Sequence, residues 1–116
     1  MRFMNKLEEA ESKIRFADYL LQMSEPEFLP GVTKHILEAA NKAVSVNFGL
    51  EGTTNVSHIL INKKLAEGSK EEREFSGTYL ALWKLATNPQ PTKEEVTKAL
   101  SRVKTFTQYV KIKRET

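Results

Sequence analysis

The sequence contains no cysteine, one aspartate and only two histidines among its 116 residues. The absence of cysteine excludes disulfides, thiolate zinc sites and cysteine nucleophiles. Because Asp18 is the only aspartate, the chain has no aspartate cluster that would hold magnesium. It also lacks a glycine-rich phosphate loop, a His-Glu-x-x-His pair and a serine in a nucleophile elbow. We therefore expect no bound metal and no cofactor.

Long apolar runs are absent as well. No stretch is long enough to cross a bilayer, and Glu8 and Glu9 interrupt the N-terminal region where a signal peptide would need an apolar segment. We expect a soluble, cytoplasmic protein without a membrane partner. The length fits one domain, residues 1–116, which can bury about two-thirds of its unfolded surface. No internal repeat, low-complexity tract or long linker divides it.

The chain instead has a strong helical periodicity. Apolar residues recur at steps of three and four, which places them on one face of a helix, and period-two alternation is not sustained anywhere. The pattern predicts an all-α fold, an up-and-down antiparallel bundle of four to five helices. Six apolar residues from different segments are expected in its core: Ile14, Ile36, Ala43, Leu82, Val103 and Phe106.

Turn and capping residues predict where the helices begin and end. We expect helices over 3–23, 32–48 and 53–66, then one opened by Ser69 with Glu72 and a last one opened by Thr92. A further capping box, Ser24 with Glu27, predicts a short helical turn leading to Pro30-Gly31. The third helix is expected to be capped by Thr53, Thr54 or Asn55, and Gly49 to end the second helix.

The net charge of +3 is unevenly distributed. Residues 92–116 hold seven Lys and Arg against three Glu, so this segment alone carries +4. Basic residues at the end of a helix complement its dipole, which is one interpretation. The other is an electrostatic footprint for RNA or another polyanion. The candidate ligand- or RNA-binding residues are these basic side chains together with His58: Arg102, Lys104, Lys111, Lys113, Arg114 and His58.

The two histidines are the remaining candidates for chemistry. His35 precedes Glu38 by three residues, so the two side chains can approach each other on one helix face, but a metal site would need a third ligand. His58 falls in the first turns of the third helix, where it either packs as a helix-terminus histidine or acts as a general acid or base.

The order of the helices, the alanine-rich second helix with Glu38-Ala39-Ala40, and the His58-Ile59-Leu60 step after a glycine-containing turn together resemble the HEPN domain (higher eukaryotes and prokaryotes nucleotide-binding). This family consists of antiparallel helical bundles. The resemblance in layout extends over nearly the whole chain. It implies a prokaryotic protein that binds nucleotides or RNA, or that serves as a partner subunit, in some members beside a small nucleotidyltransferase.

Many HEPN proteins are metal-independent ribonucleases with an arginine followed, after four to six residues, by a histidine. Neither Arg2, Arg15, Arg73 nor Arg102 has a histidine in that window, and Arg114 has too little chain after it. The resemblance therefore favours a non-catalytic binding or partner module. The alternative is a divergent ribonuclease toxin that uses His58 with a basic side chain such as Lys63 or Arg102.

The segment 79–86 is apolar almost all round, with Lys84 its only charge. If one flank faces the core, Leu80 and Trp83 lie on another flank and predict a homodimer interface, since tryptophan is enriched in interface cores. Alternatively, the neighbouring loop or Phe3 and Met4 of the same chain cover that flank.

Overall fold

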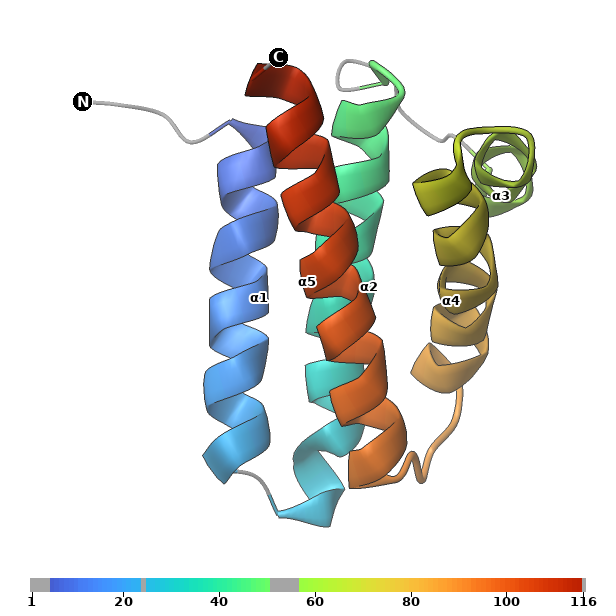
Figure 1. The fold of residues 1–116 in the computed structure, drawn as a ribbon. Coiled ribbons are helices and arrows are strands. Elements are labelled where there is room, and N and C mark those ends of the chain that lie inside the picture. The colour runs from blue at the N-terminus through green and yellow to red at the C-terminus, as the bar shows by residue number, and fades with distance from the viewer. Residues whose placement is uncertain (1–4, 24, 51–56, 116) are drawn as a thin grey trace.

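The computed structural model describes residues 5–23, 25–50 and 57–115, and these form five α-helices and no strand. The prediction of an all-α bundle is confirmed. Figure 1 shows the arrangement, with the long helices nearly parallel to one axis and a short helix across them. The elements are α1 (Lys6–Met23), the 3-10 turn η1 (Pro26–Phe28), α2 (Leu29–Asn47), α3 (His58–Ala66), α4 (Lys70–Ala86) and α5 (Lys93–Glu115).

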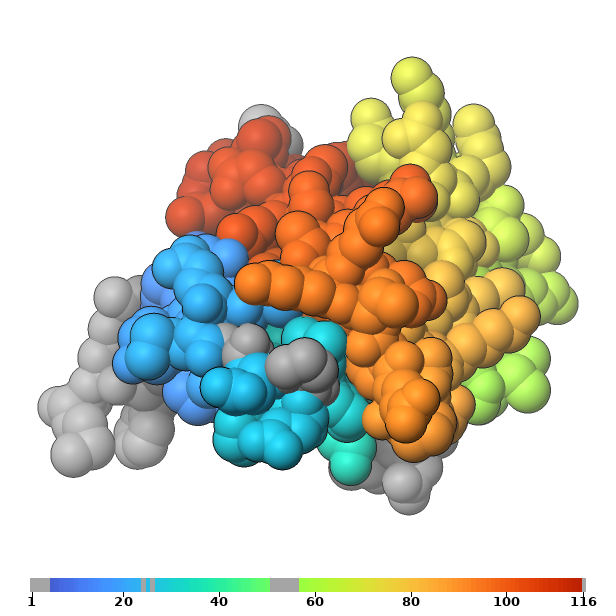
Figure 2. Space-filling view, turned by 90° about the horizontal axis from the view of Figure 1, so that it is seen from below, coloured from blue at the N-terminus to red at the C-terminus, as the bar shows by residue number. Residues whose placement is uncertain are grey.

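Successive long helices run in opposite directions, as an up-and-down bundle requires (Figure 1). Helices α2 and α5 form the middle of the molecule and contact each other, while α1 packs against both from one side and α4 from the opposite side. Figure 2 shows the same order from the end of the bundle, with α1 and α4 on opposite sides of α2 and α5. The short α3 packs mainly on α4.

The core is built from the faces that the periodicity predicts. All six residues expected there are buried, and Ile36, Ala43, Leu82 and Val103 are fully so. The Phe75 and Phe106 rings stack between α4 and α5, with centroids 4.1 Å apart. Alanines on α1 and α2 let these two helices approach closely, which gives the most extensive helix pair of the fold.

The predicted capping box of Ser69 with Glu72 is confirmed, and α5 begins after Thr92, as predicted, with a box of the same kind. The Ser69 hydroxyl accepts from the Glu72 backbone N–H while Glu72 accepts from the Ser69 N–H, and Thr92 and Glu95 make the same reciprocal pair. Gly49 follows α2 with a positive φ of 68°, the conformation that a helix-terminating glycine adopts.

Three predicted boundaries are wrong. Helix α1 begins at Lys6, after Asn5 whose Oδ1 accepts from the Glu8 N–H, instead of at Phe3. Helix α2 begins at Leu29, directly after η1, instead of at Val32, because Pro30 in the first turn needs no backbone donor and so Pro30-Gly31 does not stop the helix. Helix α3 begins at His58, with the Ser57 hydroxyl accepting from the Ile59 N–H, instead of at Thr53. Six residues that appear in the sequence-based predictions lie outside the described residues: Phe3, Met4, Ser24, Thr53, Thr54 and Asn55.

None of the helices in the described part of the chain combines the length and the apolar character that a membrane crossing needs.

Candidate functional site

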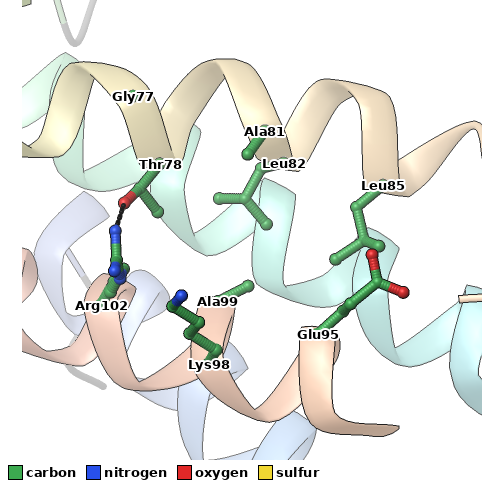
Figure 3. Close-up of a pocket in the computed structure, with 9 residues that line it drawn as sticks. All are labelled: Gly77, Thr78, Ala81, Leu82, Leu85, Glu95, Lys98, Ala99 and Arg102. Atoms are coloured by element: carbon green, nitrogen blue, oxygen red, sulfur yellow. Dashed lines mark hydrogen bonds between the residues drawn. The ribbon is translucent and has the colours of Figure 1, made fainter. Parts of the chain in front are cut away.

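The candidate site is a groove between α4 and α5 (Figure 3). It consists of two adjoining hollows of about 230 and 440 Å³ that share Thr78 and Arg102. Leu82, Leu85 and Ala99 form an apolar floor at one end, and Phe75 and Phe106 do so at the other. The groove exists because α4 presents Gly77 and Ala81 toward it, and these small residues leave the space open.

Arg102 lies in the middle of this groove. Its Nη1 donates to the Thr78 hydroxyl across the two helices at 3.3 Å, and Thr78 is itself buried. This bond orients the guanidinium and leaves its other N–H groups for a ligand, since a guanidinium carries five donors in a planar fork. Such a fork binds a carboxylate or a phosphate by two parallel hydrogen bonds.

Lys98 supplies a second positive charge one helical turn before Arg102 and lines the same hollow. Within the described parts of the chain no ion pair or hydrogen bond of its ammonium group is present. The groove thus offers two neighbouring cations above an apolar floor, an arrangement suited to a ligand with an anionic group attached to an apolar body.

The groove also contains acidic residues. Glu95 lies at one end and accepts hydrogen bonds from Thr92. These bonds, of which the one from the Thr92 backbone N–H has the largest effect, hold the pKa of the Glu95 carboxyl below its ordinary value. Glu71 and Glu74 line the other end, where Glu74 is 4.0 Å from Lys70. An anion is therefore best placed in the middle of the groove, near Lys98 and Arg102 and away from these carboxylates.

The other predicted basic residues have structural partners. Lys104 pairs with Asp18 at 3.4 Å and Lys111 with Glu11 at 3.7 Å, so both attach α5 to α1. Lys113 donates to Asn47 Oδ1 at 3.2 Å and lies over the Tyr109 ring. Arg114 lines a hollow together with two acidic residues of α1, Glu8 and Glu11. Much of the positive charge of the C-terminal helix is thus balanced within the molecule.

His58 lies away from the groove. Its ring stacks on Trp83 with centroids 4.5 Å apart, and it lines none of the hollows that Arg102 lines. Trp83 packs partly against the core, and Leu80 beside it is exposed. The flank predicted as an interface is therefore covered at Trp83 by α3, while Leu80 stays open. Lys63 lies on α3 and lines none of the groove hollows.

Neither of the other polar candidates forms a catalytic arrangement. His35 meets the edge of the Phe16 ring at 5.0 Å, while Glu38 pairs with Lys13. The buried Tyr79 hydroxyl donates to Asn41 Oδ1 at 2.6 Å, and burial raises the pKa of this phenol. We interpret this hydroxyl as a structural group that connects α4 to α2. Among the described residues no three histidine, aspartate or glutamate side chains are grouped as metal ligands would be.

Comparison with protein-family models, with curated proteins and with solved structures gives no match for this chain. The site therefore has to be judged from its own geometry. Of the residues predicted from the sequence, only Arg102 belongs to the groove, and Lys98, Thr78 and Gly77 were missed. The four-residue spacing of Lys98 and Arg102, which places two cations on one helix face, was the available signal.

Proposed function

We propose that this protein is a non-catalytic binding module of HEPN type, and that it binds an anionic ligand, a nucleotide or the phosphates of RNA, in the groove between α4 and α5. The observation that carries the proposal is the Arg102 guanidinium held by Thr78 above an apolar floor, with the Lys98 ammonium, which has no ion pair among the described residues, one turn away. The proposal includes a homodimer and, as in some HEPN systems, a nucleotidyltransferase as partner. An adjacent nucleotidyltransferase gene would support that last element.

A ribonuclease of this type would need a histidine and a cation in one cleft. His58 instead stacks on Trp83, and Arg102 bonds Thr78 in the groove between α4 and α5. This separation supports a module that binds without cleaving. We expect wild-type protein to leave both a structured and an unstructured RNA intact. Cleavage that disappears in His58→Ala would contradict the proposal and favour the divergent ribonuclease.

Binding can be tested by titrating the protein with a mononucleotide and with a short single-stranded RNA. We expect Arg102→Ala and Lys98→Ala each to weaken binding by about tenfold, the effect of one charge-assisted contact to phosphate. For the RNA, the slope of log K against log salt should be no steeper than about −1.4, because two cations neutralise two phosphates at most.

Lys104→Ala provides the matched control. It removes the same charge from the same helix, but its ammonium group faces Asp18 of α1 instead of the groove. Affinity should stay within about twofold of wild type. If Lys104→Ala and Lys98→Ala weakened binding equally, the ligand would be held by the net charge of α5 and the groove assignment would be wrong.

A further inference from the structure

A second surface lies along the seam where α1 and α2 pack antiparallel. Contacts across the seam define its register: Glu9 pairs with Lys42, Lys13 with Glu38, and Phe16 meets His35. In each pair the two residue numbers add to 51. Beyond the Phe16–His35 contact the two segments lead to Met23, the last residue of α1, and to Phe28 of η1.

The character of the seam changes along its length. In its upper half two ion pairs bridge the helices, as is usual at a solvated helix edge: Glu9 with Lys42, and Lys13 with Glu38. Its lower half carries large apolar side chains that remain in contact with water. We call this lower half the aromatic seam, and it consists of Phe16, Tyr19, Met23, Phe28, Gly31 and His35.

The aromatic seam contains half of the exposed large apolar side chains of the described residues. Phe16, Tyr19, Met23 and Phe28 are 49, 57, 68 and 58 % exposed, and the other four are Ile59, Leu60, Leu80 and Ile112. Single exposed apolar residues are ordinary, but a contiguous group of this size marks an interaction surface. Phenylalanine, tyrosine and methionine are also the residue types enriched in interface cores.

Gly31 provides an opening in the middle of this surface. A Cβ built on Gly31 would have no atom within 4 Å, so space remains over the helix at this position. Exposed apolar side chains lie in the neighbouring segments, and the backbone at Gly31 is open to a close approach. A surface with protruding side chains beside an open stretch of backbone can pack on a copy of itself about a two-fold axis.

The charges around Gly31 support this self-complementarity. Glu27 precedes it and Lys34 follows it, both are exposed, and neither has an ion pair in the parts of the chain that the structure describes. Glu27 lies in η1 and Lys34 in the second turn of α2, with Gly31 between them in the chain. A two-fold axis near Gly31 therefore brings Glu27 of one copy to Lys34 of the other, and the symmetry repeats the pair.

We infer that the aromatic seam is the homodimer interface, with a two-fold axis near Gly31. This inference rests on the homodimer included in the proposed function, and it assigns the interface to α1, η1 and α2 instead of to Leu80 and Trp83. It is independent of the anion-binding groove, because the groove is built by α4 and α5.

The test is analytical ultracentrifugation of the whole chain over a range of concentrations. We expect wild type to sediment as a dimer at high micromolar concentration, and Tyr19→Glu to sediment as a monomer with an unchanged helical circular dichroism spectrum, since Tyr19 is exposed. Leu80→Glu, which adds the same charge at an exposed residue of α4, should leave the dimer intact.

Charge exchange tests the symmetry itself. Glu27→Lys and Lys34→Glu each replace two favourable pairs by two repulsive ones, and each should raise the dimer dissociation constant about tenfold. The double variant E27K/K34E restores both pairs with their signs reversed, and its dissociation constant should return to within about threefold of wild type. No one-sided contact with a different protein would give this restoration.

The outcomes separate the two proposals. A monomeric wild type would overturn both the homodimer and its location at the aromatic seam. A dimeric wild type that Leu80→Glu dissociates and Tyr19→Glu does not would overturn the location alone and keep the dimer. Failure of E27K/K34E to regain affinity, with both single variants weakened, would overturn the two-fold axis near Gly31.

Discussion

Glu72 is a buried carboxylate whose two oxygens connect different parts of the fold. Oε1 accepts from the Ser69 N–H at the start of α4, and Oε2 accepts from Asn47 Nδ2 at the end of α2, at 2.8 and 2.6 Å. The same Asn47 amide accepts from Lys113 of α5 through its oxygen. One carboxylate thus helps to align three helices.

The pKa of Glu72 is held below 4.5. Burial alone would raise it, but the hydrogen bonds from the Ser69 backbone, Asn47 and the Ser69 hydroxyl together outweigh burial. Because the folded pKa is lower than the unfolded value, Glu72 contributes stability that is fully present above about pH 4.5 and is lost as the pH falls through the folded pKa.

We therefore predict that Glu72→Gln lowers the free energy of unfolding by about 1–3 kcal/mol at pH 7, because a neutral amide accepts more weakly and places a donor against a donor. Urea denaturation at pH 7 and at a series of acidic pH values measures this, and the loss should shrink as the pH falls through the lowered pKa of Glu72. An equal loss at all of these pH values would contradict the role of the charge.

Glu74→Gln is the control for this prediction. It makes the same change two residues away on α4, where the carboxylate is largely exposed beside Lys70. The free energy of unfolding should change by no more than about 0.5 kcal/mol.

For individual residues, part of the structure could be predicted from the sequence and part could not. The burial of Ile14 and Leu82 follows from periodicity alone, and it is confirmed. Lys104 pairs with Asp18, whereas Lys98 on the same helix has no ion pair in the part of the chain that the structure describes. This difference depends on which helix lies alongside α5. Local sequence contains no such information, so the basic residues were predicted as one group although the fold divides them between two roles.

At the scale of elements, capping chemistry and helix ends were predicted where the signal is a local hydrogen bond, as at Ser69 and Thr92. The prediction failed at Pro30-Gly31, because Pro30 lies in the first turn of α2, where a backbone N–H has no intrahelical acceptor and its absence costs nothing. The contact of His58 with Trp83 was not predicted either, because the way α3 packs on α4 depends on the tertiary structure and not on local sequence.

The glycines give a prediction about helix stability. Gly77 lies within α4 without a positive φ, and an added Cβ would meet nothing within 4 Å, whereas Gly49 has a φ of 68°. Gly77→Ala should raise the free energy of unfolding by up to about 1 kcal/mol, because alanine loses less backbone entropy in a helix. Gly49→Ala should lower it by about 1–2 kcal/mol, because a Cβ is strained at that φ.

Thermal and urea denaturation of the two variants measure these changes, and each variant controls for the other because the substitution is the same. Opposite signs are expected. If Gly77→Ala instead lowered the free energy of unfolding, the surface of α4 at Gly77 would have to be in closer contact with other groups than the structure of this single chain shows.

At the scale of the whole molecule, stability is distributed unevenly. Helix α2 buries ten of its 19 residues in the middle of the bundle, whereas α3 buries only Ile61 and Leu65 of its nine. Elements with few buried contacts open at lower free energy than the core. The α1, α2 and α5 helices therefore form the firm part of the molecule, and α3 the part that opens most easily.

We predict that the backbone amides of α3 exchange with deuterium well before those of α2. Since His58 stacks on Trp83, the fluorescence of this single tryptophan should change with the opening of α3 while the helical signal of the bundle persists. Equal protection of α3 and α2 would show that the whole chain opens in one step.

The first and last described helices lie side by side and antiparallel, so Asn5 and Leu7 line one hollow together with Lys111 and Glu115. Both described ends are therefore at the same pole of the bundle, while η1 is at the opposite pole (Figure 1). A linker of a few residues between them would give a circular permutant, with new ends in the exposed turn at Gln90. A fluorescent protein or affinity tag attached at this pole would stand clear of Phe28 and Gly31, so association through the aromatic seam can be followed with labelled protein.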